Sequence, residues 1–275
     1  MVELCSEESG AGKTHLLYLI TAIAVLPRFH HDVDLNGKNS AVIILDTEGR
    51  FETQRLAHIM RQYIAEKDST LEDVEELTYS SLKHIHIFQP QTMVSLLATL
   101  TSLDKYIFDS KAHQSSQRPL HSIIIDNAST FYWQGRAEAE SAQQTSPENT
   151  EVDSAANRAP LNPYASLVQV LRSLSNTFSC IIIATTHATF SAREPGPPAL
   201  RTLPPPWSTF PSIKLLLRRD PVRRFVKTMS IEEALSEQEG RQVMVEKARF
   251  SAQIIGSNEA FVFSIRADGV IIGEA

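Results

Sequence analysis

A glycine-rich run near the N-terminus has the residue types and the order of a phosphate-binding loop. It reads Ser9-Gly10-Ala11-Gly12-Lys13-Thr14-His15. In such a loop the glycines let backbone N–H groups curl around phosphates, the lysine reaches the outer phosphates, and the threonine hydroxyl binds Mg²⁺. The short pattern Gly-Lys followed by Ser or Thr occurs by chance in about one chain in ten of this length, so the placement between a strand and a helix is what favours a phosphate site over a surface turn. We therefore predict that this run, from Ser9 to His15, binds a nucleotide.

The run departs from the full phosphate-loop pattern at one position. A glycine is expected five residues before Gly12, and the chain has Glu7 there. A carboxylate near a polyphosphate costs Coulomb energy, and a side chain hinders the tight turn. We expect either that Glu7 points into solvent or that the affinity for a nucleotide is reduced.

An acid that could complete a metal site ends a later apolar run. Asp126 directly follows Ile123–Ile125, which has the pattern of a buried strand. An acid at this place can hold Mg²⁺ beside a phosphate loop, although an ordinary strand-ending Asp can also cap the next turn. Together with Lys13 and Thr14 the metal interpretation is favoured, and we predict Thr14 and Asp126 as the metal-binding residues.

Two further polar positions follow strand-like runs. Glu48, after Ala41–Leu45, is placed to orient an attacking water and is the predicted catalytic residue, although an acid there can also serve the start of a helix. His187 ends the cluster Thr185-Thr186-His187, which could sense a γ-phosphate or be merely solvated. We predict that His187 contributes to nucleotide binding.

The remaining clusters of charged and histidine residues are less specific. Arg218-Arg219 and Arg223-Arg224 flank Asp220-Pro221, a pattern typical of a solvated hairpin, with contact to DNA phosphates or nuclear import as the alternative. His30-His31 lacks neighbouring metal ligands in the sequence, so no metal site is predicted there.

The elements that must position these residues alternate between strand-like and helix-like patterns. Strands are predicted at Met1–Cys5, Ala41–Leu45, His84–Phe88, His121–Ile125 and Cys180–Ala184. Helices are predicted at Leu16–Leu26, Phe51–Glu66, Pro90–Phe108 (with the proline in the first turn) and Tyr164–Phe178. Such alternation gives right-handed βαβ units, so we predict an α/β fold with a mostly parallel sheet flanked by helices.

The C-terminal part has a different pattern. Strands are predicted there at Ile213–Leu217, Gln242–Phe250, Ala260–Ile265 and Val270–Ile272. A capping box at Ser230–Glu233 opens a short helix that Gly240 is expected to close. We therefore predict an antiparallel extension of the sheet.

Two segments, 134–163 and 188–211, lack the pattern of packed elements and are predicted to be mobile loops within a single domain spanning residues 1–275. The first is rich in Ala, Ser, Gln, Asn and Glu. The second holds seven of the fourteen prolines and should be stiff and extended. We expect Trp207 and Phe210, beside Pro204–Pro206, to make a fixed protein contact, with base stacking as the alternative.

Composition and charge exclude several classes of protein. The 275 residues carry 26 Lys and Arg against 32 Asp and Glu, a net charge of −6, which excludes a broadly basic nucleic-acid binder. The two cysteines, Cys5 and Cys180, lie in apolar runs, which fits a reducing compartment. The longest apolar stretch, Leu16–Leu26, is too short to span a membrane, and the N-terminus lacks a signal-peptide pattern.

In this order the motifs resemble the ATPase core of the RecA-type recombinases. In that family the phosphate loop is followed by a strand ending in D-T-E-G-x-F-x-x-x-R-L. Residues 46–56 read Asp46-Thr47-Glu48-Gly49-Arg50-Phe51-Glu52-Thr53-Gln54-Arg55-Leu56. Residues 261–270 are similar to the family's last hairpin, and residues 123–133 and 182–186 resemble a eukaryotic recombinase paralogue.

The resemblance implies a nuclear protein that binds ATP and Mg²⁺ and assists homologous-recombination repair of DNA double-strand breaks. Other recombinase paralogues would be its partners in a hetero-oligomer, and single-stranded or branched DNA would be contacted directly or through them. Lys13 and Thr14 would bind ATP and Mg²⁺, Asp126 would be the Walker B acid, and Glu48 the hydrolytic glutamate. The two predicted loops would occupy the positions of the family's DNA-binding loops.

The chain also departs from the family. His187 stands where the family usually has Gln, the first loop is long and acidic, and the second is rich in proline. No segment precedes the first strand to supply the family's polymerisation segment, so we expect no filaments from this chain alone, unless the gene model is truncated. The leading hypothesis is thus an assembly partner with weak ATPase activity. A competent DNA-dependent recombinase and an unrelated P-loop NTPase or kinase are the alternatives; the block at residues 46–56 argues against the last.

Overall fold

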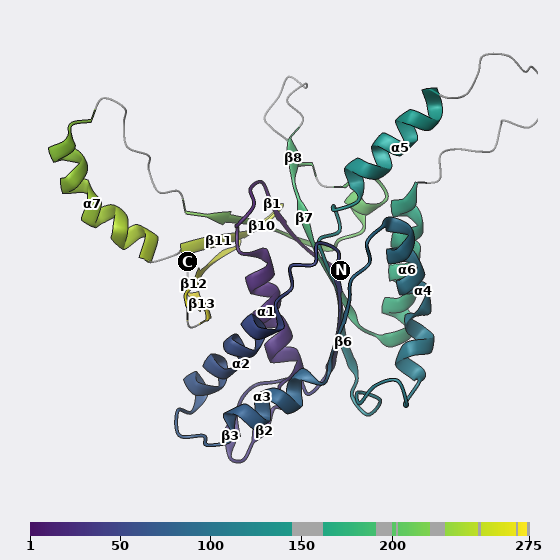
Figure 1. The fold of residues 1–275 in the computed structure, drawn as a ribbon, viewed down its shortest axis with the longest axis horizontal. Coiled ribbons are helices and arrows are strands. Elements are labelled where there is room, and N and C mark those ends of the chain that lie inside the picture. Colours follow the sequence, from purple (N-terminus) through teal and green to yellow (C-terminus); the bar gives the residue numbers. More distant parts are fainter. Residues whose placement is uncertain are drawn as a thin grey trace, which may run out of the picture.

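The computed structural model describes residues 1–144, 162–190, 200–201, 203–220, 229–246, 249–267 and 269–273, and it has an α/β architecture built on one large sheet (Figure 1). The sheet has nine strands in the order β13-β12-β11-β10-β1-β7-β6-β4-β5. Their bounds are β1 (Val2–Ser6), β4 (Ala41–Asp46), β5 (Ile85–Phe88), β6 (Leu120–Asp126), β7 (Ile181–His187), β10 (Ile213–Arg219), β11 (Arg249–Ile254), β12 (Ala260–Ile265) and β13 (Val270–Gly273).

The sheet is parallel from β10 through β1, β7, β6 and β4 to β5, and antiparallel from β10 to β13. This arrangement confirms the predicted α/β fold with a mostly parallel sheet and an antiparallel C-terminal extension, and it is consistent with a RecA-like core. Two small two-stranded sheets pair β2 (Phe29–His30) with β3 (Val33–Asp34) and β8 (Thr189–Phe190) with β9 (Leu200–Arg201).

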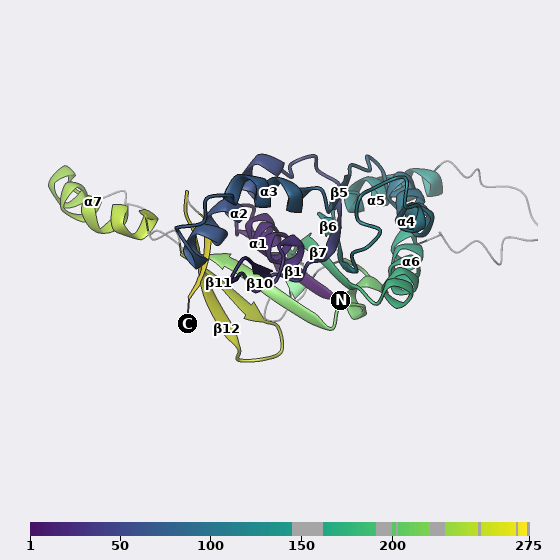
Figure 2. The same ribbon diagram turned by 90° about the horizontal axis from the view of Figure 1, so that it is seen from below.

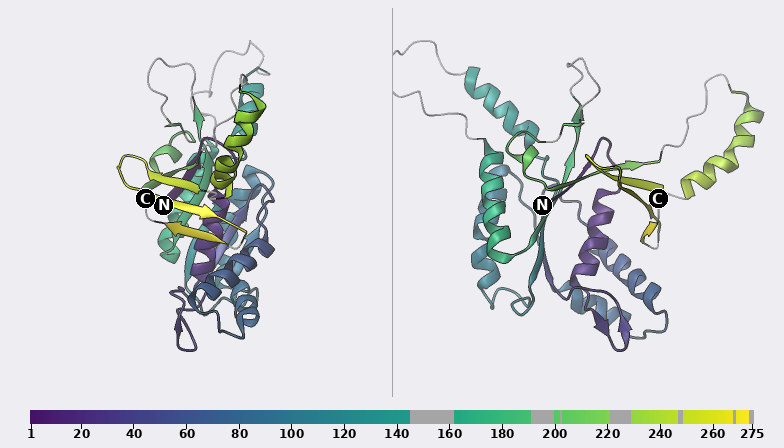
Figure 3. Two further views of the ribbon diagram at one scale, coloured as in Figure 1. Left: turned by 90° about the vertical axis from the view of Figure 1, so that its left-hand side faces the viewer. Right: turned by 180° about the vertical axis from the view of Figure 1, so that it is seen from behind.

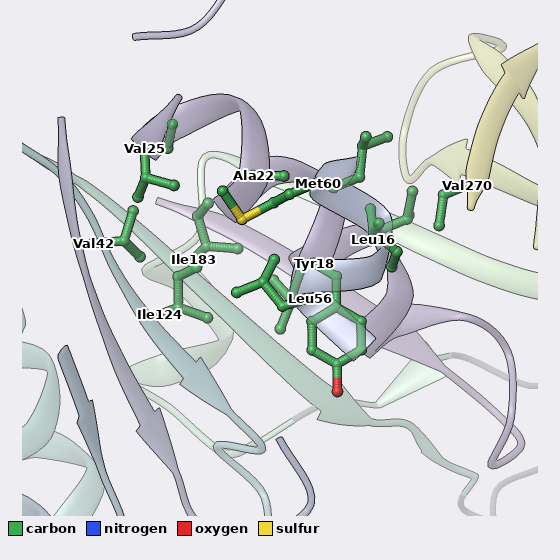
Figure 4. Packing of buried hydrophobic residues seen from close by; sticks show 14 of the residues in the cluster. Leu16, Tyr18, Ala22, Val25, Val42, Leu56, Met60, Ile124, Ile183 and Val270 are labelled. Atoms are coloured by element: carbon green, nitrogen blue, oxygen red, sulfur yellow. The ribbon is translucent and has the colours of Figure 1, made fainter. Parts of the chain in front are cut away.

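Helices cover both faces of the sheet (Figures 1 and 3). One face is covered by α1 (Lys13–Val25), α2 (Thr53–Lys67) and α3 (Val74–Leu82), and the other by α4 (Met93–Phe108) and α6 (Pro163–Phe178). Alternate residues of β4 serve the two cores: Val42 and Ile44 pack with the α1 layer shown in Figure 4, whereas Ile43 and Leu45 pack with α4 and α6.

Two element predictions need correction, and one helix was missed. Helix α4 begins at Met93 because Thr92 and Ser95 form a capping box, so Pro90 precedes the helix instead of lying in its first turn. Helix α3 was not predicted. The segment Gln242–Phe250 is not one strand, because α7 (Ile231–Glu246) continues to Glu246 and β11 starts at Arg249.

Helix α7 continues through the glycine that was expected to end it. Ser230 and Glu233 form the predicted capping box, with reciprocal backbone-to-side-chain bonds of 3.0 and 3.2 Å. Gly240 costs only about 1 kcal/mol in a helix interior, and an ion pair between Arg241 and Glu237 spans it. In Figures 1 and 2 this helix lies apart from the sheet.

The two predicted loops are structured in part. Helix α5 (Tyr132–Gln144) includes residues 134–144, where good helix formers such as Ala and Glu permit a helix, so the loop prediction is wrong there. Residues 145–161, 191–199 and 202 lie outside the described residues. In the second segment, Trp207–Thr209 forms a short 3₁₀ helix, and the Trp207 side chain is fully buried, so a mobile loop is also wrong for residues 203–211.

Both cysteines are free and buried. Burial raises the pKa of the Cys5 thiol to about 12 and that of Cys180 to about 11, so both side chains act as small apolar groups in the core. Among the helices that the structure describes, none combines the length and the apolar character needed to cross a membrane.

Candidate nucleotide-binding site

A cleft of about 770 Å³ opens at the carboxyl ends of β1, β4, β6 and β7. Ligand sites of open α/β sheets form at this edge. The lining contains all the residues predicted from sequence for nucleotide binding, metal binding or catalysis: Ser9, Gly10, Ala11, Gly12, Lys13, Thr14, His15, Glu48, Asp126 and His187. The structure thus brings the predicted residues together, while their roles stay predictions.

The loop between β1 and α1 is shaped by two glycines. Gly10 and Gly12 have φ angles of 77° and 87°, a left-handed conformation that side chains disfavour. A Cβ on Gly12 would also lie 2.9 Å from the side chains of Phe263 and Ile265. Gly12 is the N-cap residue of α1, and no side chain among the described residues accepts a hydrogen bond from the first N–H groups of the helix. These N–H groups face the cleft, where the helix dipole favours the binding of an anion.

Lys13 is a buried cation at the start of α1. Its side chain is largely buried, and its Nζ donates to the Ser6 hydroxyl at the end of β1. Burial lowers the pKa of Lys13, while the carboxylates of Asp126 and Glu48 oppose this shift. A bound polyphosphate would add negative charge beside this buried ammonium.

Asp126 is held by hydroxyl groups from two other elements. Its Oδ2 accepts a 2.9 Å hydrogen bond from Thr14 of α1, and its Oδ1 accepts one from Thr185 of β7. Burial raises the pKa of Asp126, and the two hydroxyl bonds oppose that shift. One hydroxyl and one carboxylate within hydrogen-bonding distance are a donor pair that suits a hard divalent cation.

Glu48 is positioned by residues of the adjacent strand and its own turn. The Asn127 amide donates to Oε1 at 3.1 Å, and the Arg50 guanidinium lies 3.5 Å from Oε2. The turn itself is held by the buried carboxylate of Asp46, which accepts from the backbone N–H groups of Arg50 and Phe51 at 3.1 and 3.0 Å. The carboxylate of Glu48 therefore has a fixed place in the cleft.

Sequence reasoning gave Asp46 and Asn127 no role, although both lie beside predicted site residues. Asn127 also accepts from the Ser129 hydroxyl at 2.6 Å, and the same hydroxyl accepts from the backbone N–H of His187 at 3.0 Å. Through Asn127 and Ser129, the end of β7 is connected to Glu48. Burial, with Lys13 nearby, lowers the pKa of the His187 imidazole, which favours its neutral form.

Glu7 lies outside the lining of the cleft. Its carboxylate is 2.9 Å from the guanidinium of Arg218 on β10. Of the two expectations for Glu7, the structure supports an orientation away from the site. Arg218 and Arg219 end β10, but β10 and β11 are separated in sequence by residues 220–248, which include α7, so the predicted solvated hairpin at Asp220-Pro221 is wrong for these two strands. Residues 221–228, with Arg223 and Arg224, lie outside the described residues.

Trp207 is a core residue. Its indole Nε1 donates to Oε1 of the fully buried Glu3 at 3.0 Å, and Thr186 donates to the same oxygen at 2.9 Å. Lys214 of β10 lies 3.8 Å from the other carboxylate oxygen. In this conformation the indole is available neither for a partner contact nor for base stacking, because it is fully buried and hydrogen-bonded to Glu3 of β1.

Known proteins are similar to parts of this chain. A mouse protein named DNA repair protein XRCC2 is 28% identical over 124 residues, which cover 45% of this chain and 38% of the mouse protein. The XRCC2 homolog of Arabidopsis thaliana is 22% identical over 270 residues, covering 80% of this chain and 68% of that protein. A family model with the description "Shu complex component Psy3, DNA-binding description" matches residues 7–189. Since that match spans the phosphate loop, Glu48, Asp126 and His187 and covers more than half of the chain, the protein belongs to the Psy3 family.

Proposed function

We propose that this protein is an ATP-binding recombinase paralogue that assists homologous-recombination repair of DNA double-strand breaks in the nucleus. It acts mainly as an assembly partner in a hetero-oligomeric complex of paralogues. The observation that carries the proposal is the convergence of Lys13, Thr14 and Asp126 in one cleft of a RecA-like sheet. The similarity to the family of a Shu complex component and to two DNA repair proteins supports both the repair role and the complex.

ATP with Mg²⁺ is the proposed cofactor, and the cleft fits it. Its volume is within the range of about 300–1,000 Å³ of small-molecule sites. Lys13 and the uncapped N–H groups of α1 would bind the outer phosphates, and Thr14 with Asp126 would hold Mg²⁺. The bound metal would supply charge neutralisation at the phosphates.

Hydrolysis is proposed to be slow because of the surroundings of Glu48. A glutamate that orients an attacking water needs a carboxylate oxygen that is free to accept a hydrogen bond from it. In this chain one oxygen accepts from Asn127, and the other lies 3.5 Å from Arg50. Both carboxylate oxygens therefore already have partners, which leaves Glu48 poorly placed to orient an attacking water.

A competent DNA-dependent ATPase is the second candidate, favoured by the presence of Lys13, Thr14, Glu48 and Asp126 in a single cleft. Single-turnover hydrolysis of ATP by the purified chain, with and without single-stranded DNA, separates the two. The assembly-partner proposal predicts slow turnover that DNA changes little. Strong stimulation by DNA that disappears in Glu48→Gln would instead support the second candidate.

A further inference from the structure

Two histidines and an aspartate converge far from the nucleotide cleft. His30 and His31 come from the β2–β3 hairpin, and Asp73 precedes α3. The Nε2 atoms of His30 and His31 lie 2.7 and 3.3 Å from the same oxygen, Oδ2 of Asp73, and all three atoms are within 4.8 Å of one another. Among the described residues this is the only such group of His, Cys, Asp or Glu.

The backbone of the hairpin explains why adjacent histidines point to the same place. Neighbouring residues of a strand normally project to opposite faces. His31 instead has a φ of 50°, in the left-handed region that is uncommon for residues with side chains. The turn at His31 brings its imidazole to the side of His30, and the two rings lie 4.4 Å apart between centroids.

Asp73 does not make the hydrogen bond that an aspartate at the start of a helix usually makes. An Asp at the N-cap of a helix usually accepts from the second or third backbone N–H, which stabilises the helix by about 1 kcal/mol. Asp73 occupies the N-cap of α3, yet its carboxylate makes no such bond to the described residues of the helix and faces the two imidazoles. Both elements therefore present their ligand atoms to one point.

We infer that His30, His31 and Asp73 form a binding site for Zn²⁺ or a similar borderline transition-metal ion. Two imidazole nitrogens and a carboxylate oxygen are ligands that Zn²⁺ takes at about 2.0–2.2 Å in tetrahedral sites. Such bond lengths require neighbouring ligand atoms to be roughly 3.3 Å apart, close to the 2.7 and 3.3 Å of the present contacts. The ion would replace the imidazole protons now shared with Asp73, leaving its fourth position open to water.

The bound ion would fasten the β2–β3 hairpin to the start of α3. Mg²⁺ and Ca²⁺ should not compete with Zn²⁺ for this site, because they prefer oxygen ligands to imidazole. Cys5 and Cys180 are buried and should not contribute thiolate ligands. The inference does not depend on the proposed function, since the cluster lies outside the residues that line the cleft.

The test is a titration of the full chain, free of nucleotide, with Zn²⁺ by calorimetry and with Co²⁺ by visible absorption. We expect one ion per chain, an absorption spectrum of a four-coordinate Co²⁺ site, and a higher unfolding temperature with Zn²⁺. A tenfold excess of Mg²⁺ should not displace the ion. His31→Gln, at an exposed side chain, and Asp73→Asn should each weaken binding at least about tenfold.

His58→Gln serves as the matched control, because the half-buried imidazole of His58 lies outside the cluster and bonds, among the described residues, to the backbone carbonyl of Ala267. Its affinity for Zn²⁺ should equal that of the wild type. Circular dichroism of each metal-free variant checks that the fold is retained. Absence of saturable binding, or binding that survives both His31→Gln and Asp73→Asn, would overturn the inference.

Discussion

The buried contact between Trp207 and Glu3 allows a quantitative test of the packing of the proline-rich segment. Trp207 is 0% exposed, and its indole N–H is one of two hydrogen-bond donors to Oε1 of Glu3, which is also 0% exposed. Trp207→Phe removes that donor and leaves a buried carboxylate less well satisfied, which costs about 1–3 kcal/mol. The smaller ring also leaves unfilled volume, so the free energy of unfolding should fall by about 2–4 kcal/mol in total.

The assay is urea unfolding followed by circular dichroism, with Trp133→Phe as the control. Trp133 is 58% exposed, and its substitution should change the free energy of unfolding by less than about 0.5 kcal/mol. The chain has only these two tryptophans, so in Trp133→Phe the remaining fluorescence comes from Trp207 and should resist quenching by acrylamide.

A different outcome would refute this reasoning. If Trp207→Phe unfolds like the wild type but loses affinity for single-stranded DNA or for a co-expressed paralogue, the indole is a contact residue. The structural role of the Glu3 contact would then be wrong.

Three further predictions concern single substitutions. Glu7→Gly should change the affinity for a fluorescent ATP analogue less than about twofold, because Glu7 pairs with Arg218 outside the cleft; tenfold tighter binding would show that its charge acts on the nucleotide. Glu48→Gln should retain that affinity but slow single-turnover hydrolysis by roughly 10²-fold, and an unchanged rate would remove Glu48 from the reaction. Burial, with the nearby histidines, lowers the pKa of His86 to about 4. The unfolded imidazole takes up a proton near its ordinary pKa of about 6.5, so the stability of the wild type should decline as the pH falls from about 6.5 to about 4, and His86→Gln should show a shallower decline in urea unfolding; parallel curves would contradict this.

The site residues could be predicted from the sequence where a short run of neighbouring residues carries the chemistry. The glycine and lysine of the phosphate loop, and acids directly after β-branched runs, are short patterns whose residue types are dictated by phosphate and metal chemistry. The alternation of strands with helices was sufficient to place Lys13, Glu48 and Asp126 at one edge of a parallel sheet.

Features that depend on distant contacts could not be predicted. In the sequence, Glu3 looks like an ordinary polar residue of a short strand. Its contacts with Trp207, Thr186 and Lys214 arise only when the chain folds. Likewise, nothing in His30-His31 indicates that Asp73, more than forty residues later, points at both rings. The end of α7 was misplaced because a glycine with an ion pair across it can remain within a helix.

Nucleotide binding by the cleft is the central claim, and one titration tests it most directly. A fluorescent ATP analogue is added to the wild-type chain and to Lys13→Ala, in the presence of Mg²⁺. We predict saturable binding of one nucleotide per wild-type chain, which requires Mg²⁺ and is abolished in Lys13→Ala, because that variant removes the buried cation at the start of α1. Absence of binding by the wild type, or equal affinity of the two proteins, would contradict the account.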